Sequence, residues 1–253
     1  MEQIPWAASI AAQALLAARL LFQGGWRRLP WFTAFLIAGL ARSAVLLQAP
    51  PRTMTYFYWF SFGELLLMPL LLASAWEVLR QLRRRYGPFG PWWAVWLAGL
   101  ALLLLAVLLA IASVQVNSEW AYLRLVAVSG RRWVSAVVFC CLTAAWAVTR
   151  FYGTDDHAAW LTRQRGFLIA YAALYSVAVV AFDAAGRSLA PAINQAMLAG
   201  TAALYCLWAV ALSPAAFAHM PPGRATAGDL EAMAGRWEQA LRRAVSAPRP
   251  PGE

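Results

Sequence analysis

The stretch YFYWFSFGELLLMPLLLASAWEVLRQL, residues 56–82, determines what kind of protein this chain forms. It is apolar for longer than the roughly 20 residues that a helix needs to cross a lipid bilayer. An aromatic cluster opens the stretch, which is common where a helix enters the membrane–water interface. Arginines begin at Arg80, near the end of the stretch, and continue at Arg83, Arg84 and Arg85. The pattern predicts a membrane-spanning helix that holds one acidic residue, Glu64, deep within its apolar part and a second, Glu77, near its end.

The rest of the 253-residue chain has the same character. Hydrophobic residues make up 62% and charged residues 13% of it, against roughly 25% charged in soluble domains. Only helices and closed barrels satisfy the backbone in lipid, and the alternating pattern of a barrel is missing. We therefore expect an all-α, polytopic seven-transmembrane-helix bundle. Its apolar segments are 6–22, 31–47, 56–79, 92–114, 133–148, 167–185 and 192–212.

Two of these segments leave alternatives open. The first follows Met1, Glu2 and Gln3 with no basic region, so we interpret it as an uncleaved span and not as a signal peptide. The fifth is short and bracketed by Arg131, Arg132 and Arg150, and its helix is alternatively expected to begin within residues 119–128.

The arginines predict the orientation, because basic connections stay on the cytoplasmic side. The connections that share a side with the tail hold 14 arginines. The opposite side holds 5, namely Arg52, Arg124, Arg131, Arg132 and Arg187. We expect the amino terminus outside and the carboxyl terminus in the cytoplasm of a cell inner (plasma) membrane. The net charge of +10 then favours contact with anionic headgroups over binding of nucleic acid.

The last residues form a separate unit in this interpretation. Residues 1–220 are the transmembrane domain, and residues 221–253 are a cytoplasmic tail. Leu230, Met233, Trp237 and Leu241 recur at helical spacing, which predicts an amphipathic helix over about 227–246. Such a helix lies on the membrane surface or docks to a cytoplasmic or membrane protein partner.

Arg42 and Glu64 are ionisable residues inside predicted spans that a short connection joins. At about 1.5 Å per residue, both lie roughly 10 to 13 Å below the outer surface. Burying a charge in hydrocarbon is costly unless the charge is paired, so we expect an ion pair. The pair serves either as a structural tie or as a gate, proton site or anion contact.

Other polar residues extend this candidate intramembrane site. Pro69 removes a backbone hydrogen bond and predicts a helix kink close to Glu64. Asp183, Asn194 and Gln195 are expected to line an outward-facing pocket with the pair. Glu77 is expected to pair with Arg80, three residues further on.

Catalytic and cofactor motifs are largely absent from the sequence. Asp155, Asp156 and His157 form a weak metal candidate, since metal sites need three or four converging ligands. All 21 basic residues are arginine, so no lysine can form a Schiff base with retinal or pyridoxal phosphate. We predict no catalytic residues and no cofactor, and the missing motifs argue against enzymatic activity.

The seven spans, external amino terminus and tail helix resemble the outline of seven-helix receptors and microbial rhodopsins. The missing lysine departs from the rhodopsin pattern and implies that no retinal is bound. Residues 56–82 are also similar to a span of uncharacterised seven-span proteins from high-GC bacteria. The resulting hypothesis is a non-enzymatic sensor, receptor-like protein or interaction subunit. The alternative is a small-solute or proton-coupled transporter that uses Arg42 and Glu64.

Overall fold

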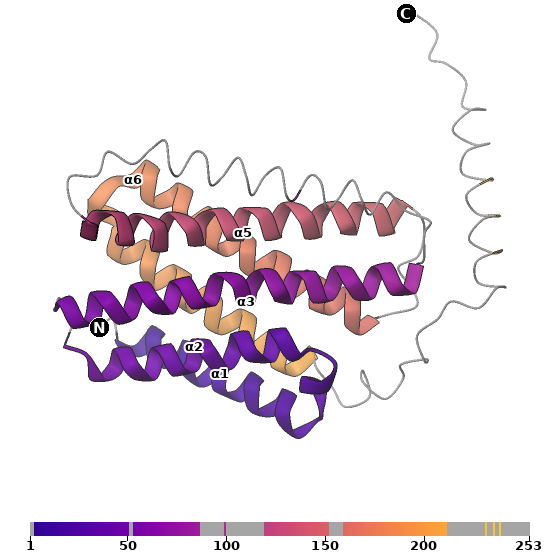
Figure 1. Cartoon of the computed structure of the whole chain (residues 1–253), viewed down its shortest axis with the longest axis horizontal. Helices are drawn as coiled ribbons and strands as arrows, with labels where there is room; N and C mark the ends of the chain where they lie inside the picture. The colour runs from indigo at the N-terminus through magenta and orange to yellow at the C-terminus, as the bar shows by residue number, and fades with distance from the viewer. Residues whose placement is uncertain are drawn as a thin grey trace, which may run out of the picture.

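The computed structural model describes residues 3–50, 53–86, 119–151 and 159–211, and the single positions Gly99, Glu231, Gly235 and Glu238. Apart from short turns, these residues are helical, and none of them forms a strand. The elements are α1 (Gln3–Phe22), the 3-10 turn η1 (Gly25–Arg27), α2 (Pro30–Gln48), α3 (Met54–Tyr86), α5 (Glu119–Phe151) and α6 (Ala159–Ala211), drawn in Figure 1.

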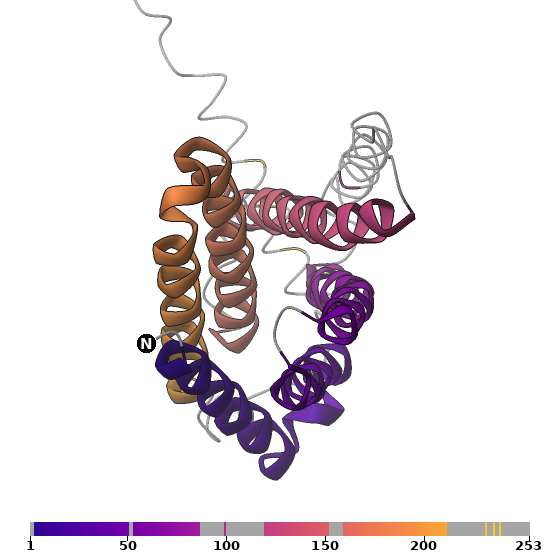
Figure 2. The same ribbon diagram turned by 90° about the vertical axis from the view of Figure 1, so that its left-hand side faces the viewer.

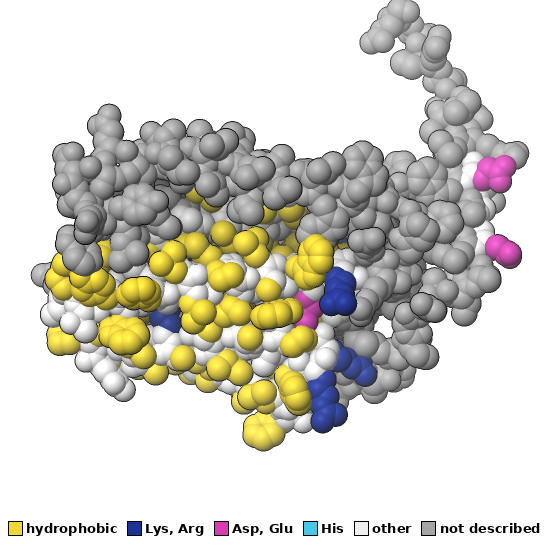
Figure 3. Space-filling model, in the orientation of Figure 1, with side chains coloured by type: hydrophobic (Ala, Val, Ile, Leu, Met, Phe, Trp, Pro, Cys, Tyr) yellow, Lys and Arg dark blue, Asp and Glu magenta, His cyan; other side chains and the backbone are white. Residues whose placement is uncertain are grey.

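Within the described ranges, four stretches are long and apolar enough to cross a membrane: Ile4–Phe22, Pro30–Gln48, Met54–Leu82 and Pro191–Ala211. A shorter apolar run, Trp133–Ala147, lies in α5. Figure 3 shows hydrophobic side chains along the visible face of the helices, with basic side chains gathered at one end. The composition and the outer face of these helices identify a helical membrane protein.

The helices extend beyond the apolar segments that predict them. α3 continues to Tyr86, past the segment end at residue 79, because arginine is a good helix former outside the hydrocarbon. α5 begins at Glu119, so the earlier of the two expected starts is correct. Arg131, assigned by sequence to a connection, therefore lies inside a helix. Of segment 92–114 only Gly99 is described, and a side chain there would meet the Cys141 sulfur.

α6 stays helical over 53 residues but reverses its direction. A straight helix of that length would measure about 80 Å. Instead, an Nη atom of Arg163 donates to the carbonyl oxygen of Ala211 at 3.0 Å. Figure 2 shows two arms of α6 side by side. Segments 167–185 and 192–212 are thus two antiparallel arms of one helical element, while the side chains of 182–188 lie outside the described residues.

The helices close into a ring when they are viewed along their axes. α2 packs on α1 and α3, α5 packs on α3 and α6, and α6 returns to α1; Figure 2 shows the arrangement. The tight connection from α1 to α2 uses Gly24, whose φ of 69° is readily adopted by glycine. Gln13 of α1 donates to the Leu36 carbonyl of α2 at 2.9 Å and thereby ties the same two helices within the bundle.

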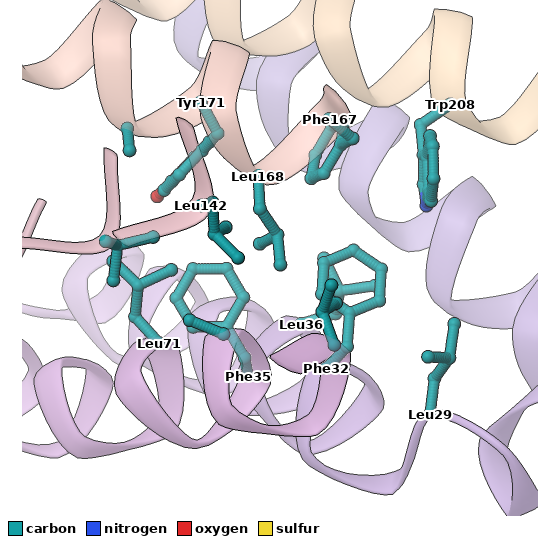
Figure 4. Close-up of a cluster of buried hydrophobic side chains, with 14 of the residues drawn as sticks. Leu29, Phe32, Phe35, Leu36, Leu71, Leu142, Phe167, Leu168, Tyr171 and Trp208 are labelled. Atoms are coloured by element: carbon teal, nitrogen blue, oxygen red, sulfur yellow. The ribbon is translucent and has the colours of Figure 1, made fainter. Parts of the chain in front are cut away.

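Aromatic rings from α2 and both arms of α6 fill the centre of the ring (Figure 4). Phe167 stacks on Trp208 with centroids 4.9 Å apart, and Phe32 meets Phe167 edge-on at 5.6 Å. Phe35 meets Tyr171 in the same way at 5.7 Å. Because both arms of α6 contribute rings, the cluster packs the two arms against each other and against α2.

Side chains from neighbouring helices cap backbone groups at the end of the bundle rich in arginine. The Phe32 N–H in the first turn of α2 donates to the Glu77 carboxylate at 3.4 Å, and Arg80 is exposed. The predicted pair of Glu77 with Arg80 is therefore wrong, because a free helix N-terminus attracts the carboxylate more strongly. Arg19 of α1 and Arg163 similarly bind carbonyls at the end of α6, Ala209 and Ala211.

We predict that Phe167→Ala destabilises the bundle by about 3 kcal/mol, since it empties the centre of the aromatic cluster. Leu66→Ala is the matched control, because Leu66 lies on α3 and is 55% exposed. Its expected cost is below about 1 kcal/mol. Unfolding of the purified protein in mixed micelles measures both values. Equal losses for the two variants would contradict the central role of the cluster.

Candidate functional site

Glu64 of α3 lies between two arginines. Its Oε1 accepts from Nη2 of Arg42 of α2 at 2.7 Å, and its Oε2 accepts from Nη1 of Arg131 of α5 at 3.0 Å. The ion pair of Arg42 with Glu64 that we expect from the sequence is present, and Arg131 joins it. One carboxylate therefore binds three helices together.

Arg131 also connects this ion pair to α6. Its Nη2 donates to the Tyr171 hydroxyl at 2.6 Å. The guanidinium carbon lies 4.7 Å from the ring centroid of Tyr175 and 5.9 Å from those of Phe35 and Tyr171. Aromatic faces attract cations electrostatically. The three rings therefore pack around the Arg131 guanidinium, and the Tyr171 hydroxyl also accepts a hydrogen bond from it.

Arg42 reaches Glu64 by crossing the surface of α3 at Gly63. A Cβ atom at Gly63 would lie 2.5 Å from Cδ and 2.6 Å from Cγ of Arg42. The guanidinium then lies 4.7 Å from the ring centroid of Phe60. The glycine directly before the acid is thus part of the site, because it leaves room for the arginine side chain.

The site is buried and unequally charged. The side chains of Arg42, Glu64 and Arg131 are 18%, 8% and 6% exposed. Two guanidinium groups face one carboxylate in this network, so it carries one positive charge in excess. Within the described part of the chain, both arginine Nε atoms and the hydroxyls of Ser61 and Ser135 are buried without a hydrogen-bond partner. These donors remain available to hydrogen-bond a further polar group.

Of the other predicted site residues, Asn194 and Gln195 make no described contact with Arg42 or Glu64. Asn194 is exposed and Gln195 half-buried on α6. The side chain of Asp183 lies outside the described residues. Pro69 is exposed, five residues and therefore about 140° around α3 from buried Glu64. α3 remains one helix through Pro69, and the predicted kink stays a prediction.

The weak metal candidates Asp155, Asp156 and His157 lie outside the described residues. In the ranges that are described, no three histidine, cysteine, aspartate or glutamate side chains converge. Cys140, Cys141 and Cys206 are free thiols. The described side chains of these types thus form no metal centre, while Arg165, which donates to the Thr149 hydroxyl at 2.6 Å, and Gln164 form a second buried polar group between α5 and α6.

Sequence reasoning missed Arg131, Tyr171 and Tyr175. Arg131 precedes an apolar run, beside Arg132, and so has the pattern of a loop residue. A signal was nevertheless present, since Arg131, Val134, Val138 and Leu142 follow helical spacing and are all buried. Phe167, Tyr171 and Tyr175 likewise form an aromatic stripe at every fourth position.

Electrostatics determine what this site can do. Guanidinium groups stay charged and bind carboxylates and other oxyanions through several N–H donors. The network can therefore hold α2, α3, α5 and α6 together, and its unused donors suit an anion. Comparison with protein-family models, curated proteins and solved structures finds no match to this chain.

We predict that Gly63→Ala destabilises the protein by about 2 kcal/mol, because the new methyl group displaces Arg42 from Glu64. Gly166→Ala is the matched control, since nothing lies within 4 Å of a Cβ at that helical position. Its effect should be within about 0.5 kcal/mol.

Gly63→Ala and Gly166→Ala, repeated in a protein that already carries Arg42→Ala, isolate the contact between Gly63 and Arg42. The cost of Gly63→Ala should then fall below about 0.5 kcal/mol, because the clashing side chain is gone. An unchanged cost in that background would show that Gly63 acts through a different contact.

Proposed function

We propose that this chain is a non-enzymatic, receptor-like sensor with seven membrane-spanning helices in a cell inner (plasma) membrane. Its amino terminus lies outside, and its tail, residues 221–253, lies in the cytoplasm beside anionic headgroups. The tail helix at about 227–246 rests on the membrane surface or contacts a protein partner. The arginine distribution supports the orientation, and the outline resembles that of seven-helix receptors.

The observation that supports a sensor is the linkage of four helices through one buried network. Arg42, Glu64, Arg131 and Tyr171 come from α2, α3, α5 and α6. A signal needs an element with two arrangements whose balance a ligand can shift. Breaking or remaking a buried ion pair changes which helix packing is favoured. Changes at the outer half can thus reach the cytoplasmic ends of the same helices.

A small-solute or proton-coupled transporter that uses Arg42 and Glu64 is the second candidate. The buried carboxylate of Glu64 favours it, because acidic groups at membrane depth are common in proton relays. The packed rings of Phe32, Phe35, Phe167 and Trp208 count against it, since they fill the ring centre next to the network. The sequence also has no visible inverted repeat. We therefore rank the sensor first.

The sensor hypothesis predicts that Glu64→Gln changes the spacing of α3 and α5 at their cytoplasmic ends. Spin labels at Arg80→Cys and Ala147→Cys, two exposed positions, report this spacing in a background without the native cysteines. Loss of the shared carboxylate frees both arginines, so a shifted or second distance population is expected in lipid nanodiscs.

Ser74→Ala is the control for this measurement. Ser74 is buried on the same helix, but its hydroxyl donates only to the Leu70 carbonyl of its own helix, at 2.7 Å. The control should keep the wild-type distances. Identical distances in wild type, Glu64→Gln and Ser74→Ala would reject a coupling role for the network.

The orientation has a direct test by labelling with a membrane-impermeant maleimide. Thr53 and Arg27 are exposed at opposite ends of the bundle, at the α2–α3 and α1–α2 connections. In intact bacterial spheroplasts, Thr53→Cys should be labelled from outside, whereas Arg27→Cys should need permeabilisation. The reverse pattern would invert the proposed topology.

A further inference from the structure

Among the side chains that the structure describes, Glu64 is the one acid paired with the two arginines of the buried network, which leaves one positive charge unbalanced. Glu64 contacts both Arg42 and Arg131 and can balance only one of them. The aromatic faces of Phe35, Tyr171 and Tyr175 offset part of the excess around Arg131. Water cannot supply the rest easily, since the Arg131 side chain is only 6% exposed. Such a charge is costly in an apolar environment unless it has a partner.

No other acid in the apolar part of the sequence lies close along the described helices. Residues 87–118 contain neither aspartate nor glutamate. Glu119 precedes Arg131 by twelve residues of α5, and Glu77 follows Glu64 by thirteen residues of α3. Asp183 follows Tyr171 by twelve residues of α6. At about 1.5 Å per residue each acid is roughly 18 to 20 Å away along its helix.

The two arginines of the network hold unused hydrogen-bond donors. The Nε atoms of Arg42 and Arg131 are buried and make no hydrogen bond within the described part of the chain. Nη2 of Arg42 is already directed at Glu64, and both Nη atoms of Arg131 are directed at Glu64 and Tyr171. The hydroxyls of Ser61 and Ser135, one helical turn from Glu64 and Arg131, are also without partners. Two buried guanidinium N–H donors in a network with one positive charge in excess match the chemistry of an anion, and the two serine hydroxyls are further buried donors on α3 and α5.

We propose that the Arg42–Glu64–Arg131 network binds a small, singly charged anion. One negative charge neutralises the excess, and the arginine N–H groups donate to it. The inference rests on the proposed function, because it names the class of ligand that would shift the sensor. The anion comes either from solution, as a small carboxylate, or from the phosphate of a lipid headgroup. Both sources offer the same singly charged oxygens.

The test uses the full chain in a neutral detergent with thermal unfolding followed by tryptophan fluorescence. One arm adds sodium acetate at constant ionic strength, with sodium gluconate, a larger anion of equal charge, as the balancing salt. A second arm adds phosphatidylglycerol, with phosphatidylcholine as its comparison. We expect a saturable rise of the unfolding temperature in at least one arm. A response to acetate identifies a soluble anion, and a response to phosphatidylglycerol alone identifies the lipid.

Charge variants give effects of opposite sign. Arg42→Gln removes the excess charge and should weaken anion binding. The half-saturating anion concentration should rise by roughly tenfold or more, as expected for a lost charge-assisted hydrogen bond. Glu64→Gln doubles the excess positive charge, so the half-saturating anion concentration should fall by a similar factor. Arg80→Gln, which changes an exposed arginine at the other end of α3, should match wild type.

Two results would overturn the proposal. One is the absence of a saturable response of the wild-type protein in both arms, which needs no variant to fold. The other is an identical response of Arg42→Gln and Arg80→Gln. Anion binding that leaves the α3–α5 spacing unchanged keeps this site but removes the sensor. If the α3–α5 spacing depends on Glu64 but no anion response is seen, the sensor proposal stands and the anion site is rejected.

Discussion

The carboxylate of Glu64, shared by Arg42 and Arg131, is the interaction on which the arrangement of the helices depends. In hydrocarbon an unpaired charge is more costly than in water, so each of the three groups constrains where the other two helices can lie. The constraint reaches α6 because Arg131 also donates to Tyr171. Three helices thus meet at one acid and a fourth joins them through Arg131, and the packing near the acid follows from these contacts.

Two features of the packing make this meeting possible. Gly63 leaves the surface of α3 open where Arg42 crosses it. The aromatic cluster holds the reversed second arm of α6 beside the first, through Phe167 and Trp208, and so keeps Tyr171 facing α5. At the other end of the bundle, Glu77, Arg19 and Arg163 bind free backbone groups of neighbouring helices. A charged network toward one end of the bundle and capped helix ends at the other therefore enclose an apolar, aromatic middle.

The sequence was informative where lipid imposes a simple rule. Apolar length located α1, α2 and α3 closely, and the rarity of charge within spans identified Arg42 and Glu64 as partners. The rule failed for Arg131, because an arginine at the edge of an apolar run has the same local pattern as a loop residue. It also failed for Glu77, whose partner is a helix terminus distant in sequence. The contacts between α5 and α6 depend on how side chains pack in three dimensions, which a hydropathy pattern cannot predict.

An infrared difference spectrum between the wild-type protein in lipid and Glu64→Gln tests the central claim most directly. If two arginines share the acid, the wild-type side of the spectrum should hold the antisymmetric stretch of an ionised carboxylate. Arg131→Gln should shift this band, because one of the two partners is lost. A carbonyl stretch of a protonated acid in the wild type would contradict the account, since a neutral Glu64 could not balance either arginine.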